Sequence, residues 1–234
     1  MGKLVGIAPR SFVLEENTTN VQDVYHLGNN YTKRVIEVGG TPIGLAPVDN
    51  WLTEEALEMC DSFLVQGGAH FFPYHFQIIH HAVTRGKRYL GVCLGQQLIY
   101  VYFEIKRRVE ELGYEGDLVK AICDYLDAQP ADFSVQRRVP NHRCEYPPRG
   151  NEDIAKHHVD IVPGTLMRRV LDREKIRICT FHNVSTPHTQ NLVPINAWSS
   201  DGVVEGTEYA DHILGIQGHP EMDSQLNELF RFLV

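Results

Sequence analysis

Residues 89–97 read Tyr89-Leu90-Gly91-Val92-Cys93-Leu94-Gly95-Gln96-Gln97, an apolar run that changes to a helical pattern at a cysteine. The run that ends at Val92 predicts a buried strand, and apolar residues then recur at helical spacing from Leu94 onward. A sharp strand-to-helix turn pushes its central side chain outward at the carboxyl edge of a sheet, and the flanking glycines leave room for that turn. The spacing therefore favours Cys93 as an exposed nucleophile, although a core cysteine packed between glycines stays open on the motif alone.

The rest of the chain alternates short β-rich runs with helical periodicity, which indicates a three-layer α/β sandwich with a largely parallel central sheet. Two further glycine-rich turns are predicted: residues 39–40 end a helix, and residues 67–68 follow a strand. Strands are predicted at residues 4–8, 41–45, 62–66, 89–92, 158–162, 177–181, 195–199, 203–207 and 213–217. Helices are predicted with an apolar face from Val24 to Val38, at residues 73–85, from residue 94 onward, and at residues 224–233.

The chain of 234 residues is expected to form a single domain across residues 1–234, because no linker-like stretch divides it. A charged segment at about 105–153, partly helical near residues 118–126 and then rich in Pro and Arg, is expected to be an insertion or lid. Nothing in the sequence indicates its role.

The composition argues against several classes of function. A net charge of −8 with interspersed signs lacks the basic face that nucleic-acid binding requires. No apolar run approaches the roughly 18 residues of a membrane span. Five scattered cysteines without a C-x-x-C pair fit a reduced compartment, so we expect a cytoplasmic protein whose cysteines are free to react.

A thiol nucleophile needs a base, and the base needs an orienting acceptor. The best candidates lie at the end of a predicted strand, in Gly215-Ile216-Gln217-Gly218-His219-Pro220-Glu221. Residues two apart in extended backbone project to the same side, so Glu221 could receive the imidazole N–H while the other ring nitrogen of His219 faces Cys93. A strand-end histidine bound to a local carbonyl is the alternative.

Two other histidine pairs compete as bases or as metal ligands. His80 and His81 are adjacent on a predicted helix, where neighbouring side chains diverge, so a surface pair is expected. His157 and His158 open a strand and face opposite sides. Neither spacing suits a metal site, and no metal or cofactor is expected.

The glycine turn Gln66-Gly67-Gly68-Ala69 is the candidate for a second oxyanion donor. Without side chains at Gly67 and Gly68, backbone N–H groups can approach a substrate carbonyl closely. The Leu94 amide, which follows the nucleophile, would be the first donor. A plain structural turn is the alternative for the glycine pair.

Taken together, the G-x-C-x-G-x-Q elbow, the earlier glycine turn and the late His219-Pro220-Glu221 resemble the class I glutamine amidotransferase superfamily, which has a flavodoxin-like fold. The resemblance implies that Cys93 is the nucleophile, His219 the general base and acid, and Glu221 the orienting carboxylate. It also implies an oxyanion hole at Gly68 and Leu94, and a glutamyl-binding role for Gln97.

Within that superfamily the chain looks most similar to the γ-glutamyl-γ-aminobutyrate hydrolase branch, of the peptidase C26 type. The similarity covers most of the chain outside about 105–153. The loop that in this branch reads V-N-S-x-H-x-Q appears here at residues 184–190, which implies substrate contacts from His188 and Gln190 beside those of Gly67. Three further stretches carry the likeness: residues 31–42, residues 158–165 and residues 200–205.

Two departures from that branch stand out. Gly218 replaces the aromatic residue that commonly precedes the histidine, so a looser wall beside the imidazole is expected. Position 94 is Leu in this chain, as it is in the ammonia-supplying amidotransferases, whereas the branch more often has Arg there.

The sequence therefore predicts a cysteine-dependent hydrolase of γ-glutamyl amides that acts through a thioester and needs no cofactor. Two alternatives remain: a glutaminase subunit that supplies ammonia to a separate synthetase, and an inactive binding homologue. The expected partner is a small γ-glutamyl molecule, with neither nucleic acid nor membrane; a homodimer is conceivable, and a synthetase partner is less expected. The leaving amine is not revealed.

Overall fold

The computed structural model describes residues 2–12, 24–128, 137–140, 142–143, 152–187 and 191–234. Within these ranges, nine strands form one sheet in the order β4-β1-β5-β6-β13-β12-β11-β8-β9. The strands of the half from β4 to β13 pair in parallel, and the strands from β13 to β9 pair antiparallel. The nine strands are β1 (Leu4–Ala8), β4 (Thr41–Gly44), β5 (Ser62–Val65), β6 (Arg88–Val92), β8 (Lys156–Ile161), β9 (Lys175–Cys179), β11 (Ile195–Ser199), β12 (Val204–Tyr209) and β13 (Ile213–Ile216).

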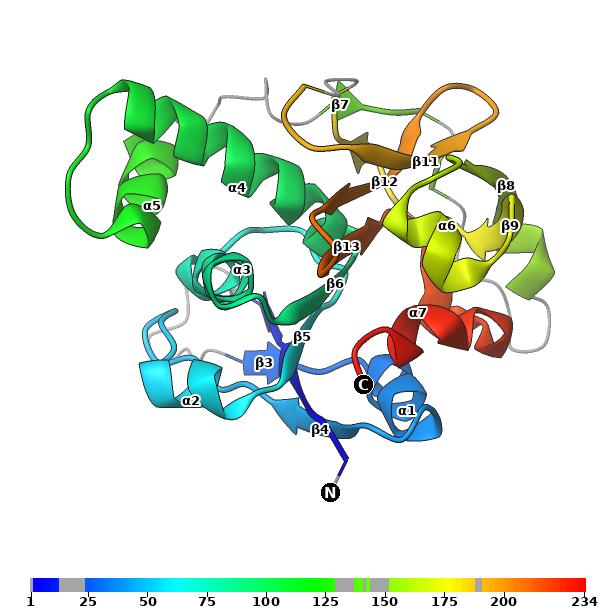
Figure 1. The fold of residues 1–234 in the computed structure, drawn as a ribbon, viewed down its shortest axis with the longest axis horizontal. Helices are drawn as coiled ribbons and strands as arrows, with labels where there is room; N and C mark the ends of the chain where they lie inside the picture. Colours follow the sequence, from blue (N-terminus) through cyan, green and yellow to red (C-terminus); the bar gives the residue numbers. More distant parts are fainter. Residues whose placement is uncertain (1, 13–23, 129–136, 141, 144–151, 188–190) are drawn as a thin grey trace.

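Helices cover both faces of the sheet, which confirms the predicted α/β sandwich (Figure 1). One face carries α2 (Glu54–Met59), α3 (Pro73–Arg85), α4 (Leu94–Glu111) and α5 (Leu118–Ala128). The other face carries α1 (Asn29–Glu37), α6 (Leu166–Leu171) and α7 (Asn227–Arg231). Short 3-10 turns lie at η2 (Glu152–Ala155), η3 (Pro220–Met222) and η4 (Ser224–Leu226).

The central strands are apolar on both sides because both of their faces are covered. In β5, Phe63 and Val65 belong to the core beneath α3 and α4, whereas Leu64 belongs to the core beneath α1 and α7. Tyr89 and Leu90 of β6 divide between the two cores in the same way. This alternation follows from the two-residue period of a strand, and it fixes which face each side chain takes.

The helix predicted from Val24 to Val38 is wrong in its first part. Residues Val24–His26 form β3, which pairs antiparallel with β2 (Arg10–Phe12), and α1 begins only at Asn29. Pairing with a distant segment supplies the backbone hydrogen bonds there, and a helical period cannot reveal such a partner. A second short pair, β7 (Arg137–Arg138) with β10 (Val184–Ser185), joins the predicted insertion to a later loop.

Two further helices were not predicted. The helices α2 and α6 have six residues each, too few for a clear periodic pattern, and each begins after a threonine side chain that accepts a backbone N–H. The predicted closing helix also starts as a 3-10 turn before it becomes α7.

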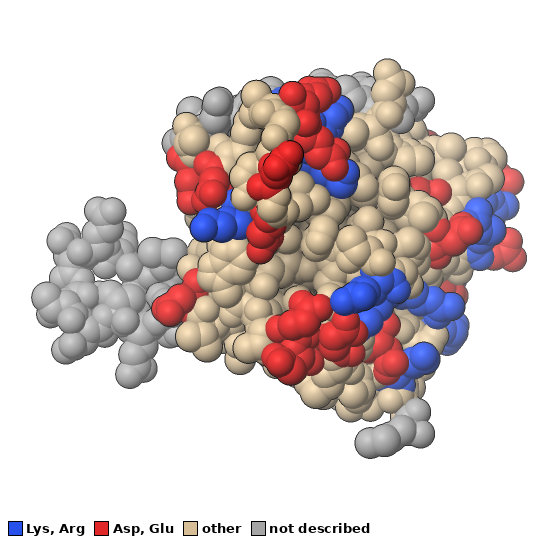
Figure 2. Space-filling view, turned by 60° about the vertical axis from the view of Figure 1, so that its left-hand side comes forward, with Lys and Arg blue, Asp and Glu red and all other residues tan. Residues whose placement is uncertain are grey.

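Charged side chains of both signs lie beside one another on the face seen in Figure 2. Ion pairs of the structure include those of Glu58 with Arg85 and Lys87, and of Arg107 with Glu111. No uniformly basic area appears among the described residues of that face. In the part of the chain that is described, no helix is long and apolar enough to cross a membrane.

Candidate active site

The candidate nucleophile Cys93 occupies the turn between β6 and α4. Its backbone lies at φ 54° and ψ −102°, a conformation that is uncommon for a residue with a side chain. A Cβ on Gly91 would lie 2.2 Å from the Gly95 carbonyl oxygen, and a Cβ on Gly95 would lie 2.3 Å from the Val65 carbonyl oxygen. Both contacts are with backbone atoms, so the turn requires glycine at these positions, as the sequence predicts.

Strand β13 brings the histidine to the cysteine. Gly215 pairs with Gly91 and Ile216 pairs with Val92, and the Cys93 amide donates to the Ile216 carbonyl at 2.9 Å. His219 follows three residues later. A Cβ placed on Gly67 would lie 3.0 Å from Cε1 of His219 and 3.2 Å from Cβ of Cys93, so both side chains face the same glycine.

The imidazole is oriented by a carboxylate. Nδ1 of His219 lies 2.8 Å from Oε1 of Glu221, and both residues are buried. Burial has the largest effect on the pKa of His219 and opposes the charged form, but Glu221 and the Cys93 thiol together outweigh it and raise that pKa well above the usual range. Arg34 fixes the backbone that follows His219, because its Nε donates to the Glu221 carbonyl at 3.1 Å.

Tyr31 also belongs to this site. The sequence marks it only as part of a helix face, yet its hydroxyl accepts from the Gly67 amide at 3.2 Å. Its pKa is raised well above the ordinary value by burial and then by the Glu221 carboxylate, so the phenol stays protonated. Gln66 fixes the same glycine turn by donating to the carbonyls of Ala8 and His26.

The predicted oxyanion positions lie side by side. A Cβ on Gly68 would come within 2.9 Å of the Leu94 side chain. Leu94 is the first residue of α4, where backbone N–H groups have no acceptor inside the helix. Gln97 lies one turn further, and its side-chain amide donates to the Val184 carbonyl at 2.9 Å and to Oε1 of Gln217 at 3.1 Å.

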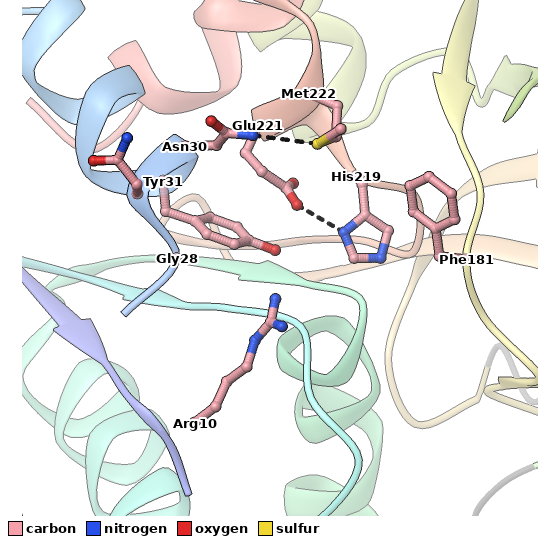
Figure 3. Close-up of a pocket in the computed structure, with 9 residues that line it drawn as sticks. Arg10, Gly28, Asn30, Tyr31, Phe181, His219, Glu221 and Met222 are labelled. Carbon is pink, nitrogen blue, oxygen red and sulfur yellow. Dashed lines mark hydrogen bonds and ion pairs between the residues drawn. The ribbon is translucent and has the colours of Figure 1, made fainter. Parts of the chain in front are cut away.

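A cavity of about 270 Å³ opens beside His219 and Glu221. Figure 3 shows Arg10, the first residue of β2, extending toward the Tyr31 hydroxyl and this cavity. Arg10 was not singled out in the sequence; its only signal is its place just beyond a strand that ends at the same sheet edge. The cavity is lined by Arg10, Gly28, Asn29, Asn30, Tyr31, Phe181, His219, Glu221 and Met222.

The space beside Gly218 is filled. A side chain at this position would lie 2.8 Å from side-chain carbons of Ile178, so Ile178 of β9 occupies the volume. The Phe181 ring packs against the imidazole of His219, with centroids 5.2 Å apart. The looser wall expected from Gly218 is therefore wrong, because another strand supplies the apolar contacts.

The remaining sequence candidates lie elsewhere. His188 and Gln190 fall outside the described residues. His158 is exposed and His157 points inward, so that pair does face opposite sides. His80 and His81 were expected to lie together on the surface, and this is wrong for His81, which is buried and packs edge-on against Phe63. His80 contacts the Tyr102 hydroxyl at 2.9 Å.

The profile of the Peptidase C26 family matches residues 74–221, a span that contains both Cys93 and the His219–Glu221 pair. The chain belongs to the Peptidase C26 family. A glutamine amidotransferase-like protein of Rickettsia prowazekii is 25% identical, with 90% of this chain and 88% of that protein aligned.

CTP synthases are also similar to this Peptidase C26 member. The CTP synthase of Sulfurimonas denitrificans is 30% identical over 74% of this chain, which spans 34% of that protein's length. The glutaminase domain of Trypanosoma brucei CTPS with bound acivicin superposes with a TM-score of 0.63 at 17% identity, covering 99% of this chain and 91% of that domain. That structure shares the glutamine amidotransferase-like α/β fold, which confirms the predicted fold class.

Proposed function

We propose that this protein is a cysteine-dependent hydrolase that cleaves γ-glutamyl amide bonds and releases glutamate. The observation that carries the proposal is the position of His219, which contacts the Glu221 carboxylate at 2.8 Å through Nδ1 and shares the space at Gly67 with Cys93. A thiol, an imidazole and an orienting carboxylate in this order are the parts that acyl transfer needs.

In the first step, the Cys93 thiolate attacks the carbonyl carbon of the γ-amide. The oxyanion that forms accepts from the amides of Gly68 and Leu94, two residues that are neighbours in space because a Cβ on Gly68 would meet the Leu94 side chain. His219, in its protonated form, gives its proton to the departing amine. The carbon–nitrogen bond breaks and a thioester to Cys93 remains.

In the second step, neutral His219 takes a proton from water, and the resulting hydroxide attacks the thioester. The carbon–sulfur bond breaks, glutamate leaves, and the Cys93 thiolate is restored beside protonated His219. The Glu221 carboxylate orients the ring and stabilises the imidazolium. These steps use side chains, the two backbone amides and water.

Arg10 supports the choice of a glutamyl substrate. Its Nε is buried and makes no hydrogen bond to any residue that the structure describes, and the side chain points into the cavity beside His219 (Figure 3). A guanidinium in this setting suits the α-carboxylate of an amino acid through paired, charge-assisted hydrogen bonds. The cavity volume also suits a ligand of amino-acid size.

The experiment that tests the proposal is a screen of glutamine, γ-glutamyl-aminobutyrate and γ-glutamyl polyamines, with released glutamate as the readout. At least one substrate should be turned over, and Cys93→Ala should abolish turnover while circular dichroism stays unchanged. Cys123→Ala is the matched control, because burial raises the pKa of that thiol to about 12 and keeps it unreactive. Full activity of Cys93→Ala would refute the mechanism.

A second candidate is a glutaminase that delivers ammonia to a separate synthetase. Similarity to CTP synthases favours it, since this chain aligns with only about a third of their length. A synthetase that co-purifies and switches on glutamine hydrolysis would support this candidate. Failure of a glutamine-like electrophile such as acivicin to label Cys93 would instead indicate an inactive binding homologue.

A further inference from the structure

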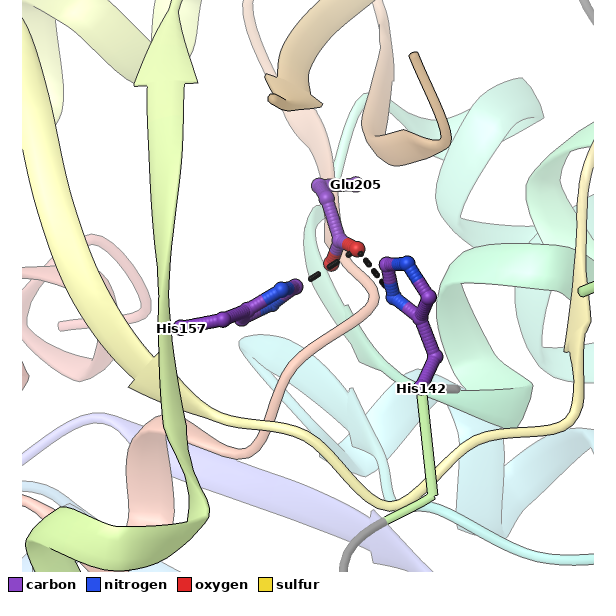
Figure 4. A group of neighbouring side chains, drawn as sticks. All are labelled: His142, His157 and Glu205. Carbon is purple, nitrogen blue, oxygen red and sulfur yellow. Dashed lines mark ion pairs between the residues drawn. The ribbon is translucent and has the colours of Figure 1, made fainter. Parts of the chain in front are cut away.

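Four side chains that the proposed reaction does not use lie close together. Glu205 comes from β12, His157 from β8, His142 from the predicted insertion, and His182 from the segment after β9. Donor atoms of His142, His157 and Glu205 all lie within 4.8 Å of one another (Figure 4). Oε1 of Glu205 lies 3.1 Å from Nδ1 of His142, 3.6 Å from Nε2 of His157 and 3.5 Å from Nε2 of His182.

This cluster lies inside the protein. Glu205 is 0% exposed, and His142 and His182 are each 3% exposed. Within the described part of the chain, the two carboxylate oxygens of Glu205 have no well-directed hydrogen-bond partner, and Nε2 of His157 has none either. Burying an uncompensated carboxylate costs roughly several kcal/mol, so a positive charge, on an imidazole or on a bound ion, is expected beside Glu205.

The outer nitrogens of two rings show where their protons are. Nε2 of His142 lies 2.9 Å from Oδ2 of Asp201, and Nδ1 of His182 lies 3.2 Å from the Val184 carbonyl. Both partners only accept hydrogen bonds, so each ring carries its N–H on that outer side. When both rings are neutral, the inner nitrogens, Nδ1 of His142 and Nε2 of His182, carry lone pairs that face each other across 3.3 Å.

We propose that His142, His157, His182 and Glu205 bind a divalent transition-metal ion of the zinc class. Tetrahedral zinc with bonds of about 2.0–2.1 Å places neighbouring donor atoms roughly 3.3 Å apart. Four of the six donor separations among these side chains run from 3.1 to 3.6 Å, and that between His142 and His157 is below 4.8 Å. A ligating histidine usually donates its other N–H to a carboxylate or a backbone carbonyl, which is the arrangement at Asp201 and Val184.

The ion would have a structural role, because protein side chains fill four positions. It joins the insertion residue His142 to two strands of the sheet and to the segment at His182. Val184, two residues further, accepts from both His182 and Gln97, so the ion also steadies the wall beside α4. The sequence gives no sign of this site, since its ligands at 142, 157, 182 and 205 lack any short metal-binding spacing.

A second cluster, made of Glu54, Glu58 and His81, does not compete as a site. Its carboxylates are 62% and 47% exposed, and both already contact Arg85. It provides a matched control instead, because Glu58→Gln removes a donor from that cluster alone.

The test uses the full-length protein stripped with a chelator and titrated with Zn²⁺ in competition with a chromophoric chelator. Co²⁺ then replaces Zn²⁺ to report tetrahedral geometry through its visible d–d absorption. We expect one ion per chain, and binding at least about 100-fold weaker in His142→Ala and Glu205→Gln. The controls Glu58→Gln, His158→Ala and Cys93→Ala should bind as the wild type does, so this result does not depend on the hydrolase proposal.

Asp201→Asn keeps the test decisive if a ligand variant fails to fold. Asp201 is largely exposed and contributes no ligand, yet the loss of its charge should weaken Zn²⁺ binding about tenfold through His142. Absence of stoichiometric Zn²⁺ binding by folded, stripped protein at micromolar concentration would overturn the proposal. Unchanged affinity in both His142→Ala and Asp201→Asn would overturn it equally, because the ion would then bind elsewhere.

Discussion

The Tyr31 hydroxyl accepts a hydrogen bond from the Gly67 amide at 3.2 Å, and so α1 is tied to the glycine turn that faces Cys93 and His219. Both Tyr31 and Gly67 are buried, so this N–H has no solvent to replace its partner. The contact couples the position of a helix to the geometry of the candidate active site.

Tyr31→Phe should therefore destabilise the protein and slow γ-glutamyl hydrolysis. Loss of the acceptor leaves the buried Gly67 amide unpaired, which costs about 1–3 kcal/mol. Urea unfolding and steady-state kinetics measure the two effects. Tyr114→Phe, at an exposed position, is the control and should change neither. Wild-type stability in Tyr31→Phe would show that the hydrogen bond is replaced.

Gly95→Ala should prevent normal folding or cost more than about 3 kcal/mol, because the new Cβ meets the Val65 carbonyl oxygen at 2.3 Å in the middle of the sheet. Gly44→Ala is the matched control: its Cβ would lie 2.5 Å from the end of the Leu27 side chain, which can move aside. The control should cost about 1 kcal/mol or less. Equal unfolding midpoints for the two variants would contradict this reasoning.

Arg10→Met should raise KM for the γ-glutamyl substrate about 10- to 100-fold with little change in kcat, because the guanidinium is proposed to bind the α-carboxylate. Arg10→Lys should restore only part of the affinity, since an ammonium cannot form the paired contact. Lys33→Met removes an exposed positive charge from α1 and should leave KM unchanged. An unaltered KM in Arg10→Met would remove Arg10 from the substrate site.

Alkylation of Cys93 should depend on the protonation of His219. The pKa of His219 is raised, so the ring keeps its proton across neutral pH, and the imidazolium stabilises the thiolate. At pH values near 6.5, wild-type Cys93 should react with iodoacetamide at least about tenfold faster than Cys93 in His219→Asn. The rates should converge in alkaline solution, where the His219 imidazolium loses its proton and its effect on the thiolate. Superimposable pH profiles, followed by mass spectrometry of the Cys93 peptide, would contradict the pairing.

His75 should make the fold sensitive to acid. Burial lowers its pKa from 6.5 to about 3, and its neutral Nδ1 accepts from the Phe72 amide. Between these pH values the unfolded chain binds the extra proton, so stability is fully present above pH 6.5 and falls as pH drops toward 3, by about 1.4 kcal/mol per pH unit.

The matched variant is His75→Gln, which cannot titrate but can still accept from the Phe72 amide. Its free energy of unfolding should fall less steeply between pH 6 and roughly 4 than that of the wild type. Parallel curves in urea titrations across this range would show that His75 does not carry the acid sensitivity.

The sequence predicted those parts of the structure that depend on residues close together along the chain. The strand-to-helix turn at Cys93 could be read from two glycines and a change of period, and His219 and Glu221 from their place at a strand end. The β2–β3 pair could not be predicted, because it depends on backbone bonds between Arg10–Phe12 and a segment about fourteen residues away. Arg10 and Phe181 join the site only through the order of strands in the sheet.

The cluster around Glu205 shows the same limit more sharply. His142 and His157 lie in chain segments whose separation along the sequence carries no pattern, and they meet only after β8, β12 and the insertion have packed. A neighbouring pair such as His157 and His158 is visible in the sequence but splits between two faces of one strand.

The pairing of Gly215 with Gly91 means that one backbone ladder sets the distance between the reacting sulfur and the imidazole. More than a hundred residues of chain lie between these two neighbouring strands, and surface loops within that excursion can change in length while the ladder between the strands stays in place. An engineer could graft a new recognition loop onto this excursion while leaving the two strands untouched.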